Sequence, residues 1–320
     1  MLDPVSELVR IESRLVGTFL QSVRRALEAE PAGSPGATIW SDYGFKWPAY
    51  ALAHLYRFEH PDNQHHKDTS CLSAAVGLLE KCTEEWEWRK GRGLKVESRE
   101  VPHYVAAALI EWLGEDVPES SRAGWEAHAE AWAAQALQKP FGFTGTYHDA
   151  WRLLSLYRLG AALEHDEWRE MAARFFRQMI TYQTPEGFWE EGRHHGPSMR
   201  YNGLMLPPLA WMYRFTGEEI FRDSAARLAE FMATYTYPDG ITVGPFDGRN
   251  CPMMAFFPAC PGMELSPRGR ALTARAFGLW RDLGSPESPD LLVESTRDAV
   301  RLAFYAADHC IYLTDHVPEG

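Results

Sequence analysis

A short pattern that recurs along the chain constrains its fold more than any other feature. An aromatic, charge-rich segment precedes an apolar stretch that ends in Leu or Met, an aromatic residue and Arg, or a close variant. The aromatic markers lie 45 to 67 residues apart, at Tyr56, Trp112 (a degenerate copy), Tyr157, Tyr213 and Trp280. Units of this length with two helices each cannot bury their apolar faces alone. The chain is therefore predicted to be a helical repeat protein whose polar aromatic loops gather on one rim.

Apolar residues recur at helical spacing along the chain, and strand-like alternation is nearly absent. We expect an all-α fold in which one helix at 3–29 is followed by five helical hairpins. The expected pairs are 46–58 with 68–88, 103–114 with 121–138, 148–162 with 165–182, 201–215 with 218–234, and 267–283 with 291–307. Short strands are expected only near 240–244 and 310–313. Unequal loops before each pair favour a closed α/α toroid of five to six hairpins, in a single domain spanning 1–320, over an open solenoid.

Charge and cysteine usage exclude several classes of protein. The net charge of −12 argues against a nucleic-acid binder, which would carry a clustered basic face. Five cysteines without CxxC spacing predict reduced thiols rather than a disulfide framework or a zinc site. No apolar run approaches the length of a membrane span, and no signal peptide is visible. We therefore expect a cytoplasmic protein, or a periplasmic one if a leader has been removed.

Aromatic residues make up 13% of the chain, and several lie in loops beside charged residues. Flat rings next to polar groups suit sugars, because the C–H faces of a sugar stack while its hydroxyls form hydrogen bonds. The segment 39–47 offers Trp40, Asp42, Lys46 and Trp47 as sugar-binding residues. The helix start near 103 adds His103 and Tyr104. In the competing interpretation, Trp47 belongs to the core and Asp42 caps a helix.

Two further segments carry ionisable residues, one at the expected helix start near 148 and one in the expected loop 235–265. In the first, His148 is a candidate general base, because its unperturbed pKa is the nearest to neutrality, and Trp151 a candidate stacking residue. Asp149 either caps the helix or acts on substrate. In the second, Asp247 and Arg249 flank a glycine, and a pairing that stiffens the turn is preferred to a role in binding.

The segment 187–203 is the richest in polar groups. Its candidates are Trp189, Glu190, Glu191, Arg193, His195, Arg200, Tyr201 and Asn202. Arg193 and Arg200 could clamp a carboxylate, and Tyr201 could transfer a proton if a nearby cation lowers its pKa. Metal binding by the adjacent His194 and His195 is not expected, because no carboxylate spacing of the metalloenzyme type accompanies them. We expect neither a metal nor a cofactor.

Three motifs resemble the α/α-toroid domain of the heparinase II/III-like polysaccharide lyases. They are Tyr147-His148-Asp149-Ala150-Trp151 followed by 153–160, then Gly187-Phe188-Trp189-Glu190-Glu191-Gly192, then Tyr201-Asn202-Gly203. The resemblance implies β-elimination from a uronic acid, with Tyr201 and His148 as the proton-transfer pair. It places Arg200, His195 and Asn202 on the substrate carboxylate. In that family a large β-sheet domain follows the toroid, and no such domain is expected within residues 1–320.

Other functions remain open at this point. A glycoside hydrolase similar to the unsaturated glucuronyl hydrolases would use paired carboxylates drawn from Asp42, Asp149, Glu190 and Glu191. A non-catalytic glycan-binding repeat protein is a third class. Terpenoid cyclisation fits poorly, because no aspartate-rich motif is present. The expected partner is an oligosaccharide or polysaccharide, with a homodimer plausible and neither nucleic acid nor membrane expected. The catalytic candidates are Tyr201, His148, His195, Asp149 and Glu191.

Overall fold

The computed structural model describes residues 3–29, 46–91, 101–138, 147–190, 196–237, 260–283 and 296–314. Within these ranges it contains eleven α-helices and no strand, and its β pairing is an isolated bridge between Glu190 and Pro197. The all-α prediction is confirmed. The helices are α1 (Pro4–Ala29), α2 (Lys46–Arg57), α3 (Thr69–Gly91), α4 (Val101–Leu113), α5 (Glu119–Gln138), α6 (Tyr147–Ala162), α7 (Asp166–Ile180), α8 (Met199–Thr216), α9 (Glu219–Thr234), α10 (Pro267–Leu283) and α11 (Thr296–Thr314).

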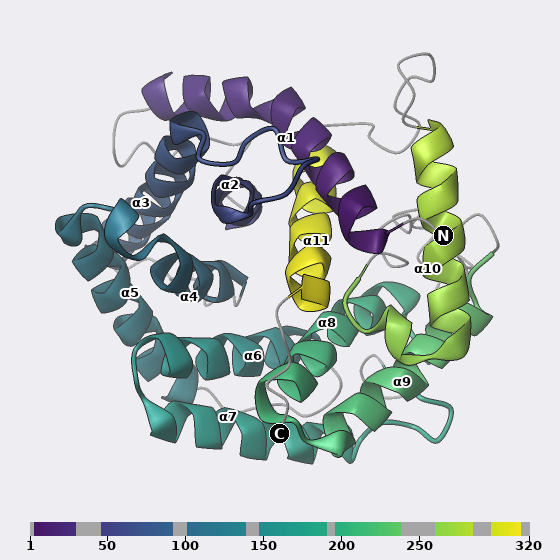
Figure 1. Ribbon diagram of the computed structural model, residues 1–320. Helices are drawn as coiled ribbons and strands as arrows, with labels where there is room; N and C mark the ends of the chain where they lie inside the picture. Colours follow the sequence, from purple (N-terminus) through teal and green to yellow (C-terminus); the bar gives the residue numbers. More distant parts are fainter. Residues whose placement is uncertain are drawn as a thin grey trace.

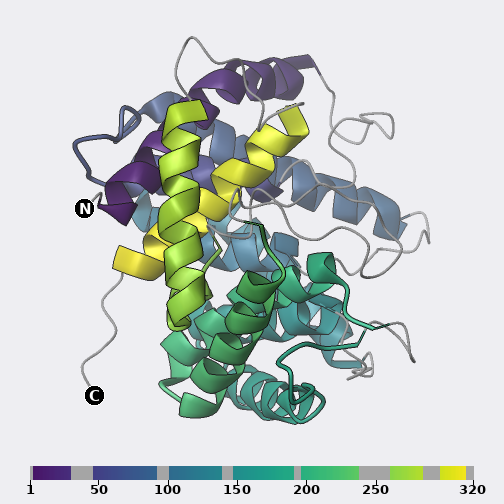
Figure 2. The same ribbon diagram turned by 90° about the vertical axis from the view of Figure 1, so that its right-hand side faces the viewer.

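The helices form an inner and an outer set (Figure 1). Helices α2, α4, α6, α8 and α11 lie inside, and the other six surround them. Along the inside, α4 packs between α2 and α6, and α6 packs against α8. The last helix, α11, packs against α1 and α2, so the two ends of the chain close on each other. Figure 2 shows the first residues of α1 and the last residues of α11 on the same side of the molecule.

Burial explains this division. In α6 every residue from Asp149 to Gly160 is buried, which requires neighbours on all sides of the helix. In α7, the apolar residues Trp168, Ala172, Phe176 and Met179 are buried at helical spacing, and charged residues occupy the other face. Burying one large apolar side chain stabilises the fold by roughly 1.5–3 kcal/mol. A helix that is apolar on all sides, such as α6, is therefore most stable inside, and a helix with one apolar face, such as α7, is most stable outside.

Two expectations about the C-terminal region are corrected. Residues 310–313 belong to α11 and are not a strand, because Cys310 and Ile311 continue the helical run that is buried from Leu302 onward. The last predicted pair also differs from the other four, since α10 packs against α9 and α1 whereas α11 packs against α1 and α2. The expected strand at 240–244 lies outside the described residues. Among the helices described, none is long and apolar enough to cross a membrane.

The turn before the candidate segment depends on Gly187. Its φ is +101°, and a Cβ there would lie 2.5 Å from the Arg227 carbonyl oxygen in α9. Gly217, which ends α8, also has a positive φ of +69°, but a Cβ there would meet no atom within 4 Å. The two glycines therefore separate backbone strain from steric clash.

We expect Gly187→Ala to lower the free energy of unfolding by about 3 kcal/mol, since strain and clash add. Gly217→Ala should cost only about 1 kcal/mol, from the left-handed backbone alone. Urea unfolding followed by circular dichroism measures both values. Equal losses in the two variants would contradict the close packing of the 184–188 turn on α9.

Candidate functional site

A buried carboxyl group lies where the inner helices meet. Asp308, on α11, is fully buried, and its Oδ1 accepts hydrogen bonds from the hydroxyls of Tyr50 on α2 and Tyr104 on α4, each at 2.8 Å. The indole Nε1 of Trp211 on α8 donates to Oδ1 and Oδ2, both at 3.1 Å. Four inner helices thus converge on one side chain.

The environment of Asp308 favours its neutral form. Burial raises the pKa of this carboxyl, and the donors from Tyr104, Trp211 and Tyr50, with the charge of Arg158, offset only part of that effect. Among the described residues, Oδ2 receives only the shared Trp211 N–H, whereas Oδ1 accepts three bonds. The less engaged oxygen, Oδ2, is therefore the one on which a proton would be held.

An arginine lies against the aromatic rings beside this carboxyl. The guanidinium carbon of Arg158, on α6, is 4.6 Å from the ring centroid of Tyr104, 5.2 Å from that of Trp112 and 6.0 Å from that of Trp211. Its Nη2 lies 3.3 Å from the Glu111 carboxylate. Its Nε and Nη1 are buried and have no acceptor in hydrogen-bonding geometry within the described ranges. Buried aromatic faces that stabilise a cation are therefore already present here.

More rings extend this aromatic cluster. The Tyr50 ring lies 4.9 Å from Phe304 and 4.8 Å from Trp112, and Trp151 meets Tyr104 edge-on at 5.4 Å. Trp47 lies 6.4 Å from Phe304. We call Asp308, Arg158 and these rings the central cluster: Trp47, Tyr50, Tyr104, Trp112, Trp151, Trp211 and Phe304.

Three of the predicted sugar-binding residues belong to the central cluster and are buried, namely Trp47, Tyr104 and Trp151. The Trp151 indole donates to the Leu204 carbonyl at 2.8 Å, which ties α6 to α8. His103 lies elsewhere, buried and stacked on Trp132 at 4.0 Å between α4 and α5.

The starts of α6 and α8 bring the predicted proton-transfer residues close together. The Tyr147 ring lies 4.0 Å from His148 and stacks on Tyr201 at 4.9 Å. His148 is exposed and Tyr201 half-buried. Asp149 is buried and lies 3.0 Å from Arg152, so its carboxylate is engaged in an ion pair.

Asn202 has a structural task in this region. Its Oδ1 accepts from the backbone N–H of Trp189 at 2.8 Å, and its Nδ2 donates to the carbonyls of Trp189 and Ser198, both at 3.0 Å. The Trp189 side chain is buried and donates to the Met179 carbonyl at 3.2 Å. Glu190 is exposed, and its backbone forms the bridge to Pro197. The amide of Asn202 therefore holds the segment before α8 in place.

The structure does not describe the side chains of the remaining candidates from the sequence analysis. Lys46 and Arg200 lie in α2 and α8, where only the backbone at these positions is described. The others lie outside the described residues: Trp40, Asp42, Glu191, Arg193, His195, Asp247 and Arg249. Their roles stay predictions.

The sequence patterns do not single out Asp308, Tyr50 or Trp211. Asp308 interrupts the apolar run 302–313, and Arg158 is the arginine of the recurring pattern. A charged residue in a helix that is otherwise buried all round is the signal that could have pointed to both.

Comparison with known proteins gives a limited likeness. No protein-family model matches the sequence, and no curated protein matches it. Two solved structures of the type II terpene cyclase MstE from Scytonema are similar in fold, each with a TM-score of 0.44 over 98% of this chain and 99% of that chain. One contains the product merosterolic acid A and is 12% identical to this chain, and the other is without ligand and 13% identical.

This finding corrects the function expected from sequence. These two structures are of a terpene cyclase and not of an enzyme acting on glycans, which contradicts the expectation of a polysaccharide lyase or glycoside hydrolase and of polysaccharide or uronic-acid degradation. Two residues of the motifs that suggested a lyase or hydrolase have structural partners. The amide of Asn202 is used by the main chain and the carboxylate of Asp149 by Arg152.

We expect Asn202→Ala to lower the free energy of unfolding by about 3 kcal/mol, because it removes three hydrogen bonds and leaves buried main-chain groups of Trp189 unpaired. Glu190→Ala, an exposed change in the same segment, should stay within about 0.5 kcal/mol of the parent. Chemical denaturation measures both. An Asn202→Ala protein of unchanged stability would contradict the structural role.

Proposed function

We propose that the protein is an enzyme that transfers a proton from Asp308 to an apolar, unsaturated substrate, in the manner of proton-initiated isoprenoid cyclisation. The observation that carries this proposal is a buried carboxyl with a raised pKa at the centre of a dense aromatic cluster. The side chains of the inner helices are its support, and the overall likeness at a TM-score of 0.44 is not.

The initiating proton transfer uses the one acid of the central cluster, and the substrate supplies the double bonds. The Asp308 carboxyl gives its proton to one carbon of a carbon–carbon double bond, and the alkene π electrons form the new C–H bond. A carbocation is left on the other carbon, and Asp308 becomes a carboxylate. A second double bond of the substrate attacks the cation and closes a ring. Loss of a proton from the last cation to water completes the reaction, and a proton returned from water restores the Asp308 carboxyl.

The surroundings of Asp308 support both parts of this step. The hydroxyls of Tyr50 and Tyr104 and the indole of Trp211 stabilise the carboxylate that proton transfer leaves behind. Aromatic faces stabilise a carbocation by the same attraction that holds Arg158 against Tyr104 and Trp112, about 2 kcal/mol for each desolvated contact. A cation in an apolar setting needs such faces, since water would quench it.

We infer further that the two helical sets form an α/α toroid. The alternation of inner and outer helices and the closure of α11 onto α1 and α2 support this reading. In a toroid the inner helices surround a single axis, so residues far apart in sequence share one centre, as those of the central cluster do.

A second candidate function is binding of a small anionic molecule without turnover. The observation that favours it is Arg158, whose buried Nε and Nη1 have no acceptor among the described residues. A carboxylate or phosphate could accept from both nitrogens. Calorimetric titration with isoprenoid carboxylates and diphosphates, on the parent and on Arg158→Lys, distinguishes binding alone from binding with conversion.

We expect linear isoprenoids offered as alcohols, carboxylates and diphosphates to yield cyclic products that mass spectrometry detects. In deuterium oxide the product should carry one deuterium from the initiating step. Asp308→Asn should abolish conversion by about 1,000-fold or more, because the amide has no acidic proton. Asp223→Asn, an exposed change on α9, is the matched control. Cyclic products formed equally by Asp308→Asn, or no conversion of any substrate, would contradict the proposal.

The same proposal fixes the sign of the pH dependence. Because burial raises the pKa of Asp308, the protonated acid persists to higher pH than an exposed aspartate would allow. We expect the rate to be highest at low pH and to fall as the pH rises through that pKa, since the ionised carboxylate has no proton to give. A rate that rises with pH over the same range would contradict a general acid. The measurement is a pH–rate profile on folded protein.

A further inference from the structure

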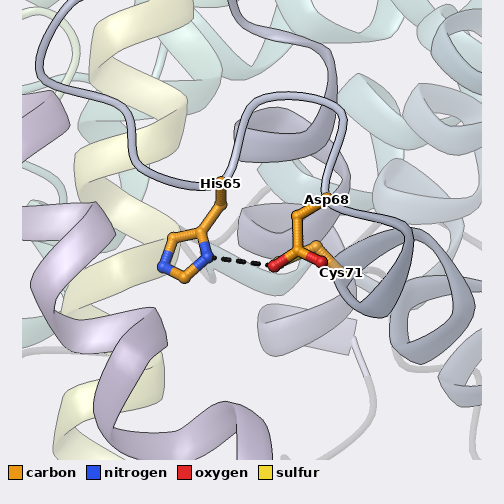
Figure 3. Close-up of side chains that lie close together, drawn as sticks. All are labelled: His65, Asp68 and Cys71. Atoms are coloured by element: carbon orange, nitrogen blue, oxygen red, sulfur yellow. Dashed lines mark hydrogen bonds and ion pairs between the residues drawn. The ribbon is translucent and has the colours of Figure 1, made fainter.

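Three side chains with metal-binding atoms lie together where α3 begins (Figure 3). His65 and Asp68 belong to the connection after α2, and Cys71 lies in the first turn of α3. His65 Nδ1 is 3.3 Å from Asp68 Oδ2, the Cys71 sulfur is 3.8 Å from the same oxygen, and all three atoms lie within 4.8 Å of one another. Four ligands at tetrahedral angles around zinc lie about 3.3–3.7 Å apart, so little movement would be needed.

In His65 and Asp68, the polar atom that does not face the cluster already has a hydrogen-bond partner in the protein. His65 Nε2 lies 3.3 Å from the Ser13 carbonyl of α1, an acceptor only, so this nitrogen carries the proton. Nδ1 then turns its lone pair to Asp68 Oδ2, and two electron-rich atoms at this distance need a cation or a second proton between them. Asp68 Oδ1 accepts from the Ser70 backbone N–H at 2.9 Å, which caps α3 and leaves Oδ2 facing the cluster. Such outer contacts are typical of metal ligands.

Helix α1, the purple helix beside His65 in Figure 3, carries a buried carboxylate whose charge acts on this cluster, that of Glu12. Glu12 is fully buried, and its Oε2 is bound to His54 Nδ1 at 2.7 Å. Its Oε1 is buried and has no hydrogen-bond partner within the described part of the chain. An oxygen of this kind costs roughly 1–3 kcal/mol, which a bound cation would offset.

Glu12 interacts electrostatically with two residues of the cluster, His65 and Cys71. Burial raises the pKa of Glu12, whereas the charge of His54 and, more weakly, that of His65 lower it. Burial, the charge of Asp68 and, more weakly, that of Glu12 raise the pKa of the Cys71 thiol to about 12. A metal ion bound here would lower the pKa of this thiol, because the cation reverses the sign of the local charge.

We propose that His65 Nδ1, Asp68 Oδ2 and Cys71 Sγ bind one divalent transition-metal ion, with Zn²⁺ the best fit. One nitrogen, one oxygen and one thiolate suit zinc, whereas magnesium and calcium take oxygen donors alone. On binding, the Cys71 S–H bond breaks, the sulfur keeps the electron pair and bonds to the metal, and the proton leaves to solvent. Three protein ligands leave the fourth position to water, and the ion ties the connection after α2 to the start of α3.

The test uses the whole protein after treatment with a chelator, followed by addition of Zn²⁺ or Co²⁺ alone. We expect one ion per chain, a rise in the melting temperature, and a cobalt spectrum with a sulfur-to-metal charge-transfer band. Asp68→Asn should weaken binding by about 100-fold or more, since even second-shell partners contribute about 10- to 100-fold. This variant keeps a residue that caps α3 equally well, so it should fold.

Cys71→Ala should remove the charge-transfer band, and His66→Gln, a half-buried neighbour of His65, is the matched control that should bind as the parent does. Alkylation of Cys71 gives a second readout that does not depend on a variant folding, because zinc should protect this thiol in the parent. A parent that binds less than one ion per chain, or an unchanged affinity in Asp68→Asn, would overturn the proposal.

Discussion

The interior of the protein is organised around the cost of burying one carboxyl group. A buried acid without partners would cost several kcal/mol, and donors from α2, α4 and α8 offset part of that cost for Asp308. Each donor must reach one point, so the rotation of its helix about its own axis is fixed. The outer helices then cover apolar faces whose directions follow from the inner ones.

Stability alone does not account for this arrangement. A buried polar network is often no more stable than apolar side chains of the same volume, and Arg158 keeps two buried N–H groups without an acceptor in the described ranges. A buried N–H group without an acceptor calls for an explanation, such as a bound ligand or a catalytic role. The polarity of the central cluster therefore supports the proposed function, and its many aromatic side chains suit the proposed apolar substrate better than a sugar, whose hydroxyls need several polar partners.

Helices were predictable because their signal is local. Residues three and four apart share a face, so apolar spacing reveals a helix wherever it is buried on one side. The strand expected at 310–313 is wrong because these four apolar residues, taken alone, fit a strand as well as a helix. The buried helical run before them continues through them. The central cluster was beyond such reasoning. Asp308 meets partners 258, 204 and 97 positions away, and no local pattern encodes those separations.

Local polar density is a poor guide to chemistry for a related reason. The sequence near Asn202 is rich in groups that could bind a substrate, yet the amide of Asn202 forms its hydrogen bonds with the main chain of Trp189 and Ser198. At 65–71 the opposite holds. His65, Asp68 and Cys71 do not lie in one regular element, because the first two precede α3 and the third is in its first turn. The charge of Glu12 acts on them only because the fold places α1 nearby. What a polar side chain can do is thus decided by which of its atoms the backbone leaves unused.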